Sequence, residues 1–277
     1  MMAICPSDPT VLSPVGRPVP VLGEFPNTVA VSMKNKLVCV GSTGAKAGIS
    51  CATFSDVDGL SQMDYLRPFD LNQTTPPVGP FNTVSQTFFS EDESFLFTTV
   101  KGDPTVNKTA SISSKGVSSS PPGTAVLFGS EQIPGTSSVF VADPSFGAAI
   151  LSVDEKTERA SLVSKQVIAN QQATCWTTIS TVTKSAFVTD PGLNRIVEMS
   201  LTNASIISAI NVTVPASDGI IDLKAAGNYI YALSAGNQTE VVVLDISGGQ
   251  GSGKVIQHLG LDNMEVGKSA QGMAVLM

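Results

Sequence analysis

Two stretches of the chain repeat one another, and this repeat constrains the fold more than any other feature. "SVFVADPSFGAAILSVD" (residues 138–154) is matched 47 positions later by "SAFVTDPGLNRIVEMSL" (residues 185–201). Each stretch reads as a β-type run, an Asp-Pro turn and a second β-type run. Short strands that recur in this way are typical of a β-propeller, in which each blade is a four-stranded sheet.

The rest of the chain divides into further units of the same kind. Five units can be placed, and their first strands lie roughly 40 to 56 residues apart. These first strands lie in "TVAVS", "VSQTFF", "TAVLFGS", "CWTTIS" and "GIIDLKAA". We predict that residues 1–277 form a single all-β domain, a β-propeller of about five complete blades. "VLSPVGRPVPV" near the N-terminus and "AQGMAVLM" at the C-terminus are expected to share a further, partial blade.

Composition and motifs exclude several classes of partner. Sixteen Lys and Arg against 23 Asp and Glu give a formal net charge of −7, so we expect no nucleic acid partner. No apolar run approaches the ~20 residues that cross a bilayer, and no membrane association is expected. No phosphate loop, dinucleotide fingerprint or metal-ligand cluster is present, which predicts no cofactor and no metal. "GGQGSG" (residues 248–253) lacks the Lys-Ser/Thr ending of a phosphate loop and predicts a flexible turn. We expect a monomer.

The cysteines and the glycosylation motifs favour an oxidising compartment. Cys39 and Cys51 lie on two β-type runs joined by a Gly-rich turn, which predicts a hairpin disulfide. Two buried free thiols are the alternative, since cysteine packs well in cores. Cys5 and Cys175 are too isolated in the sequence to be paired. Five Asn-x-Ser/Thr motifs predict a secreted, extracellular glycoprotein; they lie at Asn72, Asn107, Asn203, Asn211 and Asn237. The opening "MMAICPSDPT" lacks signal-peptide features, so the signal is expected outside this chain.

Several segments carry a resemblance to a known family. They are "GEFPNTVAVS", "LVCVGSTGAKAGISC", "LNQTTPPVGPFNTVSQTFFSEDESF", "ATCWTTIS" and "SAQGMAVLM". In these segments the chain resembles the fungal secreted branch of the lactonase-type seven-bladed propeller family, described as 3-carboxymuconate cyclase-like. The resemblance covers nearly the whole chain in order, and family members extend further at the N-terminus by about two blades.

The resemblance implies an enzyme, but its catalytic positions are altered here. Family members hold substrate carboxylates with arginines in a central funnel and transfer protons with His or Glu. The position of the family histidine falls on Ser85, and two arginine positions fall on Pro144 and Pro191. His258, the single histidine, lies in an outer-strand pattern that favours a surface or packing role. Two functions stay open: a lactonase or cycloisomerase acting on muconate-type dicarboxylates or their lactones, and a non-catalytic secreted glycoprotein, either a surface antigen or a binding module.

The catalytic residues cannot be assigned, but a binding set for a small anionic molecule can be proposed. Lys101 and Arg195 are the cations nearest the expected funnel mouth, and carboxylates or amides nearby complete the set. Each of these residues also has a plainer interpretation, as a solvated loop charge or as a partner of backbone amides. The substrate-binding candidates are Glu24, Gln86, Lys101, Arg195 and Asp222.

Overall fold

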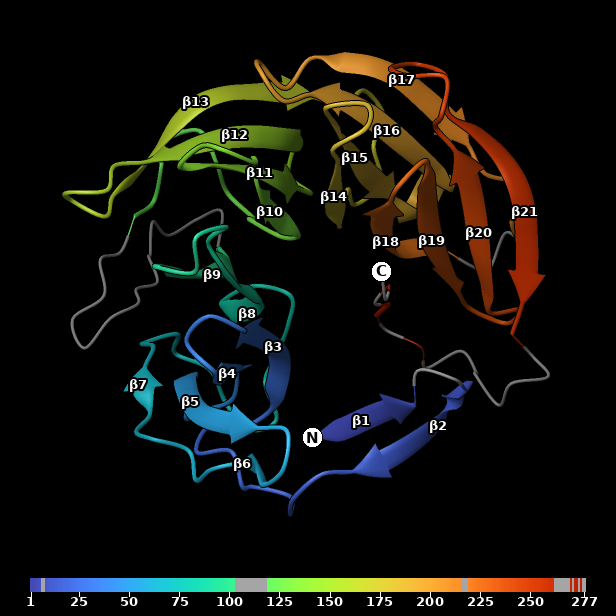
Figure 1. Cartoon of the computed structure of the whole chain (residues 1–277). Coiled ribbons are helices and arrows are strands. Elements are labelled where there is room, and N and C mark those ends of the chain that lie inside the picture. Colours follow the sequence, from blue (N-terminus) through green and yellow to red (C-terminus); the bar gives the residue numbers. More distant parts are fainter. Residues whose placement is uncertain are drawn as a thin grey trace. The chain divides into compact units, whose positions relative to one another are not determined.

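The computed structural model describes residues 1–5, 8–102, 119–215, 219–261, 270, 272, 273 and 275. The chain divides into two compact units, Met1–Ser118 (unit 1) and Ser119–Met277 (unit 2). In the described residues every regular element is a β-strand except one 3-10 turn, η1. The prediction of an all-β chain is confirmed, and Figure 1 shows the sheets of each unit.

Unit 1 holds a hairpin, a blade-like sheet and a two-stranded sheet. Strands β1 and β2 pair with each other; β3, β4, β5 and β6 follow in order, with β7 beside β5; β8 pairs with β9. All of these pairs are antiparallel. The bounds are Met2–Cys5 (β1), Asp8–Pro14 (β2), Pro26–Ser32 (β3), Leu37–Ser42 (β4), Gly48–Ser55 (β5), Gly59–Leu60 (β6), Arg67–Pro68 (β7), Thr83–Phe89 (β8) and Leu96–Lys101 (β9).

Unit 2 consists of three four-stranded antiparallel sheets, in which the strands follow one another in sequence order. These are three consecutive propeller blades. The first contains β10 (Ser130–Gln132), β11 (Ser138–Asp143), β12 (Gly147–Val153) and β13 (Ala160–Val167). The second contains β14 (Thr177–Ser180), β15 (Ser185–Asp190), η1 (Pro191–Leu193), β16 (Arg195–Ser200) and β17 (Ile206–Asn211). The third contains β18 (Gly219–Ala226), β19 (Tyr229–Ala235), β20 (Glu240–Asp245) and β21 (Lys254–Gly260).

The five predicted repeats correspond to these sheets, with local differences. The second repeat shows two strands, and its predicted continuation lies in residues 103–118, outside the described residues. The first strand of the third repeat begins only at Ser130, later than "TAVLFGS" suggests. Before this strand, the N–H groups of Ala125 and Val126 donate to the Asp143 carboxylate. Residues 270–277 are described at four positions and none lies in a strand, so the partial blade stays a prediction.

The core of unit 2 lies between its blades. Successive side chains of a strand point to opposite faces, so a blade between two others buries both faces. On β15, Phe187 packs toward the third blade together with Ile196, Ile230 and Leu244. Its neighbour Val188 packs toward the first blade together with Phe140. This arrangement explains why every residue of β15 is buried and why the strand shows no alternation of apolar and polar residues.

The predicted disulfide is present in unit 1. Cys39 on β4 lies directly opposite Cys51 on β5, and the two residues are bonded with a Cα–Cα distance of 4.1 Å. Both side chains belong to the unit 1 core, next to Ile49 and Val84. The prediction is confirmed because the register of a short hairpin is a local property that the sequence specifies.

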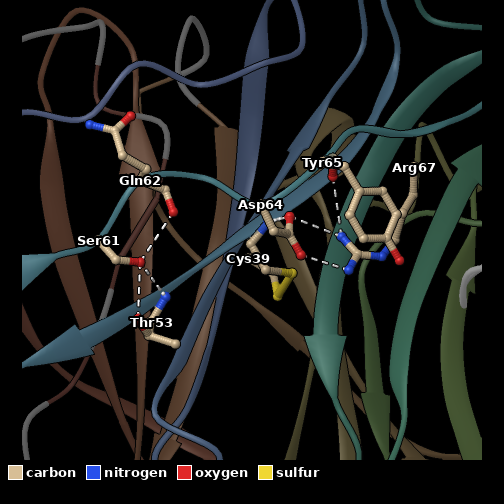
Figure 2. A network of polar contacts seen from close by, with 8 residues as sticks. Cys39, Thr53, Ser61, Gln62, Asp64, Tyr65 and Arg67 are labelled. Carbon is tan, nitrogen blue, oxygen red and sulfur yellow. Dashed lines mark hydrogen bonds and ion pairs between the residues drawn. A yellow bond between two sulfur atoms is a disulfide. The ribbon is translucent and has the colours of Figure 1, made fainter.

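A polar network ties the chain after β6 to this disulfide strand, as Figure 2 shows. The N–H of Cys51 donates to Asp64 Oδ1 (2.8 Å), and Arg67 Nη2 pairs with Asp64 Oδ2 (2.7 Å). The Arg67 guanidinium lies 4.1 Å from the ring centre of Tyr65. Burial alone would raise the pKa of Asp64, but the Arg67 and Cys51 hydrogen bonds outweigh it and keep the pKa below its ordinary value. The network is therefore structural.

The loop that contains "GGQGSG" is held in place by a buried carboxylate. Glu198 on β16 is fully buried, and it accepts hydrogen bonds from the Ser185 hydroxyl (2.7 Å) and the Ser208 hydroxyl (3.1 Å). It also accepts one from the N–H of Gly251 (2.8 Å), and Gln250 Nε2 donates to the carbonyl of Thr183 (2.9 Å). The predicted turn is present, and a side chain distant in sequence binds it.

Candidate functional site

The two Asp-Pro turns hold the chain together rather than facing a ligand. Asp143 ends β11 and accepts from the N–H groups of Ala125 (2.8 Å) and Val126 (3.1 Å) and from the Ser145 hydroxyl (2.6 Å). Asp190 ends β15 and accepts from the N–H of Gln172 (2.8 Å). Both carboxylates are fully buried. In each blade the aspartate thus binds the segment that leads into the first strand of the same blade, and in both blades an N–H 18 positions earlier donates to it.

Arg195 is engaged by this second turn. Its Nε donates to Asp190 Oδ2 (2.8 Å), and its Nη2 donates to the carbonyl of Ala169 (2.9 Å). The guanidinium compensates the buried carboxylate, which would otherwise be an unpaired buried charge. Arg195 therefore has a structural role, because its charge is paired with the buried Asp190 carboxylate.

Three of the predicted binding residues lie in unit 1. Glu24 accepts from the Thr75 hydroxyl and from the N–H of Lys46 (3.4 Å), and the Thr75 hydrogen bond lowers the pKa of Glu24. Gln86 lies at a β-bulge in β8, and Lys101 ends β9. Both side chains are half-buried. The Glu24 contacts fix neighbouring loops, and a binding role for these three residues stays a prediction.

Asp222 lies on β18 in unit 2 and is 5% exposed. Its Oδ1 accepts from the N–H of Leu223 (2.7 Å) and its Oδ2 from the N–H of Met273 (2.7 Å). Burial raises the pKa of this carboxyl above its ordinary value, although both hydrogen bonds and the charge of Lys224 act in the opposite direction. Asp222 lies on the same strand as Lys224, two positions before it.

A cluster that the sequence did not reveal joins the first strands of all three blades of unit 2. Strands β10, β14 and β18 lie next to one another, each at the same edge of its sheet (Figure 1). Glu131 on β10 lies 3.7 Å from the Lys224 ammonium on β18. Between them on β14, Thr178 interacts with Glu131 and accepts a hydrogen bond from the N–H of Ala225 (3.2 Å). We call Glu131, Thr178 and Lys224 the inner cluster.

Burial dominates the electrostatics of the inner cluster. Burial raises the pKa of Glu131 above its ordinary value of 4.5, even though Lys224, the N–H of Ile179 and the Thr178 hydroxyl act to lower it. Glu131 Oε2 has no hydrogen-bond partner in the described part of the chain, since 3.7 Å to Lys224 is too long for a hydrogen bond. The side chains of Glu131 and Lys224 remain 33% and 36% exposed, although the Oε2 atom of Glu131 is itself buried. A carboxyl with a raised pKa beside a cation is the arrangement that proton-transfer sites use.

The sequence also singles out His258, Trp176 and the asparagines of the glycosylation motifs. His258 lies on the outermost strand β21, with Nδ1 3.1 Å from Glu240, which agrees with a surface role. Trp176 packs against the core between the second and third blades. Of the five Asn-x-Ser/Thr motifs, Asn107 lies outside the described residues and the other four asparagines are exposed; these are Asn72, Asn203, Asn211 and Asn237.

Neither a membrane span nor a metal site is found in the part of the chain that the structure describes. No helix there has the length and hydropathy to span a bilayer. No group of three or more His, Cys, Asp or Glu side chains is placed there to hold an ion.

Comparison with known proteins gives the fold. The chain matches no protein-family model and no curated protein sequence. A periplasmic gluconolactonase of Pseudomonas aeruginosa is similar with a TM-score of 0.63 at 16% identity, over 90% of this chain and 73% of that one. The chain has a β-propeller fold. A putative 6-phosphogluconolactonase of Bacteroides uniformis gives a TM-score of 0.60 at 13% identity, over 84% and 71% of the two chains.

The propeller fold is shared by similar structures of other kinds. The WD40 propeller domain of Doa1 gives a TM-score of 0.59 at 10% identity, over 86% of this chain and 69% of that domain. Lactonases and a WD40 domain therefore resemble this propeller about equally well. At such low identity the function must be argued from side chains, because one fold supports many activities.

Proposed function

We propose that this propeller is a lactonase-type enzyme that opens the ring of a small lactone with water at the inner cluster. The observation that supports the proposal is the Glu131–Lys224 pair, a carboxyl with a raised pKa 3.7 Å from an ammonium. Glu131 would take the proton of the attacking water, and Lys224 would stabilise the oxyanion that develops on the lactone carbonyl. The proton then passes to the ring oxygen as the carbon–oxygen bond breaks, which leaves a hydroxy acid. Names of similar structures, gluconolactonase and 6-phosphogluconolactonase, agree with this reaction class.

Cyclisation of a muconate-type dicarboxylate is the less favoured reaction of the same site. A substrate with two carboxylates calls for two converging cations, and the described residues of the inner cluster supply one, Lys224. Arg195 is already bound to Asp190. A non-catalytic secreted glycoprotein remains the second candidate, supported by the four exposed asparagines in glycosylation motifs.

Turnover of lactones tests the proposal directly. We expect the protein to hydrolyse at least one of a panel of sugar δ-lactones, γ-lactones and muconolactone, followed as acid release in a pH-stat. Glu131→Gln should lower kcat by about 10² to 10⁴-fold, because it removes the proton acceptor and keeps the shape. The matched control is Glu240→Gln, whose carboxylate contacts His258 at the outer edge of the third blade.

Folding must be separated from catalysis in this test. Because the folded-state pKa of Glu131 is raised, the ionised carboxylate is disfavoured in the fold at neutral pH. Glu131→Gln should therefore melt at pH 7 no earlier than the wild type. A wild-type protein without turnover of any lactone, and with glycans detected by intact mass, would favour the second candidate instead.

The pH profile gives a further prediction. A general base works when ionised, so kcat/KM should rise with pH through an apparent pKa above 4.5, the ordinary value for Glu131. Lys224→Met should move that pKa further upward, because the lysine charge favours the ionised carboxylate. Lys254→Met is the control, since Lys254 pairs with Asp245 elsewhere in the third blade. If the apparent pKa of the kcat/KM profile is unchanged or lower in Lys224→Met, then Lys224 does not act on the catalytic carboxylate and is not part of the site.

A further inference from the structure

Glu131 and Thr178 occupy the same position in two successive blades. Glu131 on β10 lies opposite Phe140 on β11, and Thr178 on β14 lies opposite Phe187 on β15. The two phenylalanines are matched in the repeat, and Glu131 and Thr178 are likewise 47 positions apart (178 − 131). Strands β10 and β14 lie next to one another (Figure 1), so the two residues stand at the same level of adjacent first strands.

Each of these two side chains receives a hydrogen bond from the first strand of the next blade. The N–H of Ala225 on β18 donates to Thr178 Oγ1 at 3.2 Å. The N–H of Ile179 on β14 acts in the same way on the Glu131 carboxyl. A side chain at this position therefore bridges its own first strand and the next one, and Thr178 lies in the middle of the three strands.

The Thr178 hydroxyl has a further hydrogen bond to make. A hydroxyl carries one hydrogen to donate, in addition to the lone pair that accepts from Ala225. The Thr178 side chain is almost fully buried, and a buried hydroxyl donates its hydrogen to a nearby acceptor in most proteins. The Glu131 carboxyl is that acceptor, because the Thr178 hydroxyl acts on it as a hydrogen-bond donor.

We infer that Thr178 is a positioning residue for Glu131: its hydroxyl accepts the N–H of Ala225 on β18, donates to the carboxyl on β10, and so orients that carboxyl. The β-branched side chain of a threonine has few rotamers on a strand, and the Ala225 hydrogen bond restricts the hydroxyl further. A donor of fixed direction favours one orientation of the carboxyl and its ionised form. In this role Thr178 acts through Glu131 and need not touch a substrate.

The ionisable groups on the strands around Glu131 leave this donor open to a clean test. On β18, Lys224 lies 3.7 Å from Glu131, and Asp222 lies two positions before Lys224. On β11, Asp143 is bound by backbone N–H groups, and β14 carries no ionisable side chain. Removal of the Thr178 hydroxyl therefore changes no charge beside Glu131.

Only the catalytic consequence of this positioning rests on the proposed function. If lactones are hydrolysed, loss of the Thr178 hydroxyl should move the kcat/KM profile to higher pH together with the titration of Glu131. It should also lower kcat more than it changes KM, because the proton acceptor is misoriented while Lys224 is unaltered.

Titration of the Glu131 carboxyl carbon by NMR tests the inference without any substrate. The sample is the full chain with ¹³C-labelled glutamate, and Glu131→Gln assigns the signal. Thr178→Val keeps the shape and removes the donor, so the pKa of Glu131 should rise by about one unit, the lower end of what loss of a hydrogen bond to a charged group produces. Thr178→Ser keeps the hydroxyl and should titrate like the wild type.

Thr177→Val is the matched control. Thr177 is also buried on β14, it points to the opposite face of the strand, and its Oγ1 has no hydrogen-bond partner in the described residues. Its loss should leave the Glu131 titration unchanged. Hydrogen exchange of the Ala225 amide is the second readout, and it should become about three- to tenfold faster in Thr178→Val but not in Thr178→Ser.

The outcomes separate a positioning role from a structural one. An unchanged Glu131 titration in Thr178→Val, even with faster exchange of Ala225, would make Thr178 a structural link between β14 and β18 and overturn the inference. An equal rise in Thr177→Val would overturn it too. If Thr178→Val does not fold, Thr178→Ala decides the point by the same titration. A wild type without lactone turnover, whose Glu131 titration still responds to Thr178→Val, would refute the proposed function and support this inference.

Discussion

Glu198→Ala should lower the free energy of unfolding of unit 2 by about 3 kcal/mol, because three hydrogen bonds to a fully buried carboxylate are lost together. The donors are the hydroxyls of Ser185 and Ser208 and the N–H of Gly251. A donor left without a partner costs about 1 to 3 kcal/mol where it is buried, and the Ser185 hydroxyl can still bond with Thr183. The melting temperature should fall by roughly 6 to 12 °C for a unit of this size, measured by scanning calorimetry.

Two variants separate this effect from a general effect of losing a glutamate. Glu155→Ala is the matched control, since Glu155 is exposed in the turn after β12 and its loss should change the melting temperature little. Glu198→Gln keeps one acceptor oxygen and should be intermediate. The loop that contains Gly251 should also become sensitive to protease in Glu198→Ala. A melting temperature equal to that of the Glu155 variant would show that Glu198 does not hold the loop.

Removal of the Cys39–Cys51 disulfide should destabilise unit 1 by about 2 to 4 kcal/mol. The bond joins cysteines 12 positions apart, and closing a loop of about this length restricts the unfolded chain by roughly 3 kcal/mol in the entropic account. The double variant Cys39→Ala/Cys51→Ala also loses buried sulfur next to Ile49 and Val84, which adds to the effect. Thermal unfolding of unit 1 followed by circular dichroism would measure the loss.

The chain provides its own control for this prediction. Cys175 lies in unit 2 outside any disulfide, near the carbonyl of Ile221. Cys175→Ala should leave the melting of unit 1 unchanged, and reducing agent should lower the melting of the wild type and of Cys175→Ala equally. Reducing agent without effect on either protein would contradict a stabilising disulfide.

What the sequence determined by itself is mostly local. β-type runs separated by turns predicted the strands, because strand propensity and turn chemistry act within a few residues. The same reasoning favoured a pairing of Cys39 with Cys51, which lie opposite each other on β4 and β5. The Asp-Pro motif predicted turns for a local reason as well. The sequence did not show that Asp143 and Asp190 also accept hydrogen bonds from backbone N–H groups 18 positions earlier. That contact is seen only in the folded chain.

The tertiary structure decided which polar residues meet. Glu131, Thr178 and Lys224 come from three different blades, and Lys224 is 93 positions from Glu131 (224 − 131). No spacing rule covers such a contact, because it depends on how the first strands of successive blades pack. Arg195 illustrates the converse: the sequence marked it as an available cation, and the fold pairs it with buried Asp190. Desolvation, which raises the pKa values of Glu131 and Asp222, exists only once neighbouring strands exclude water around them.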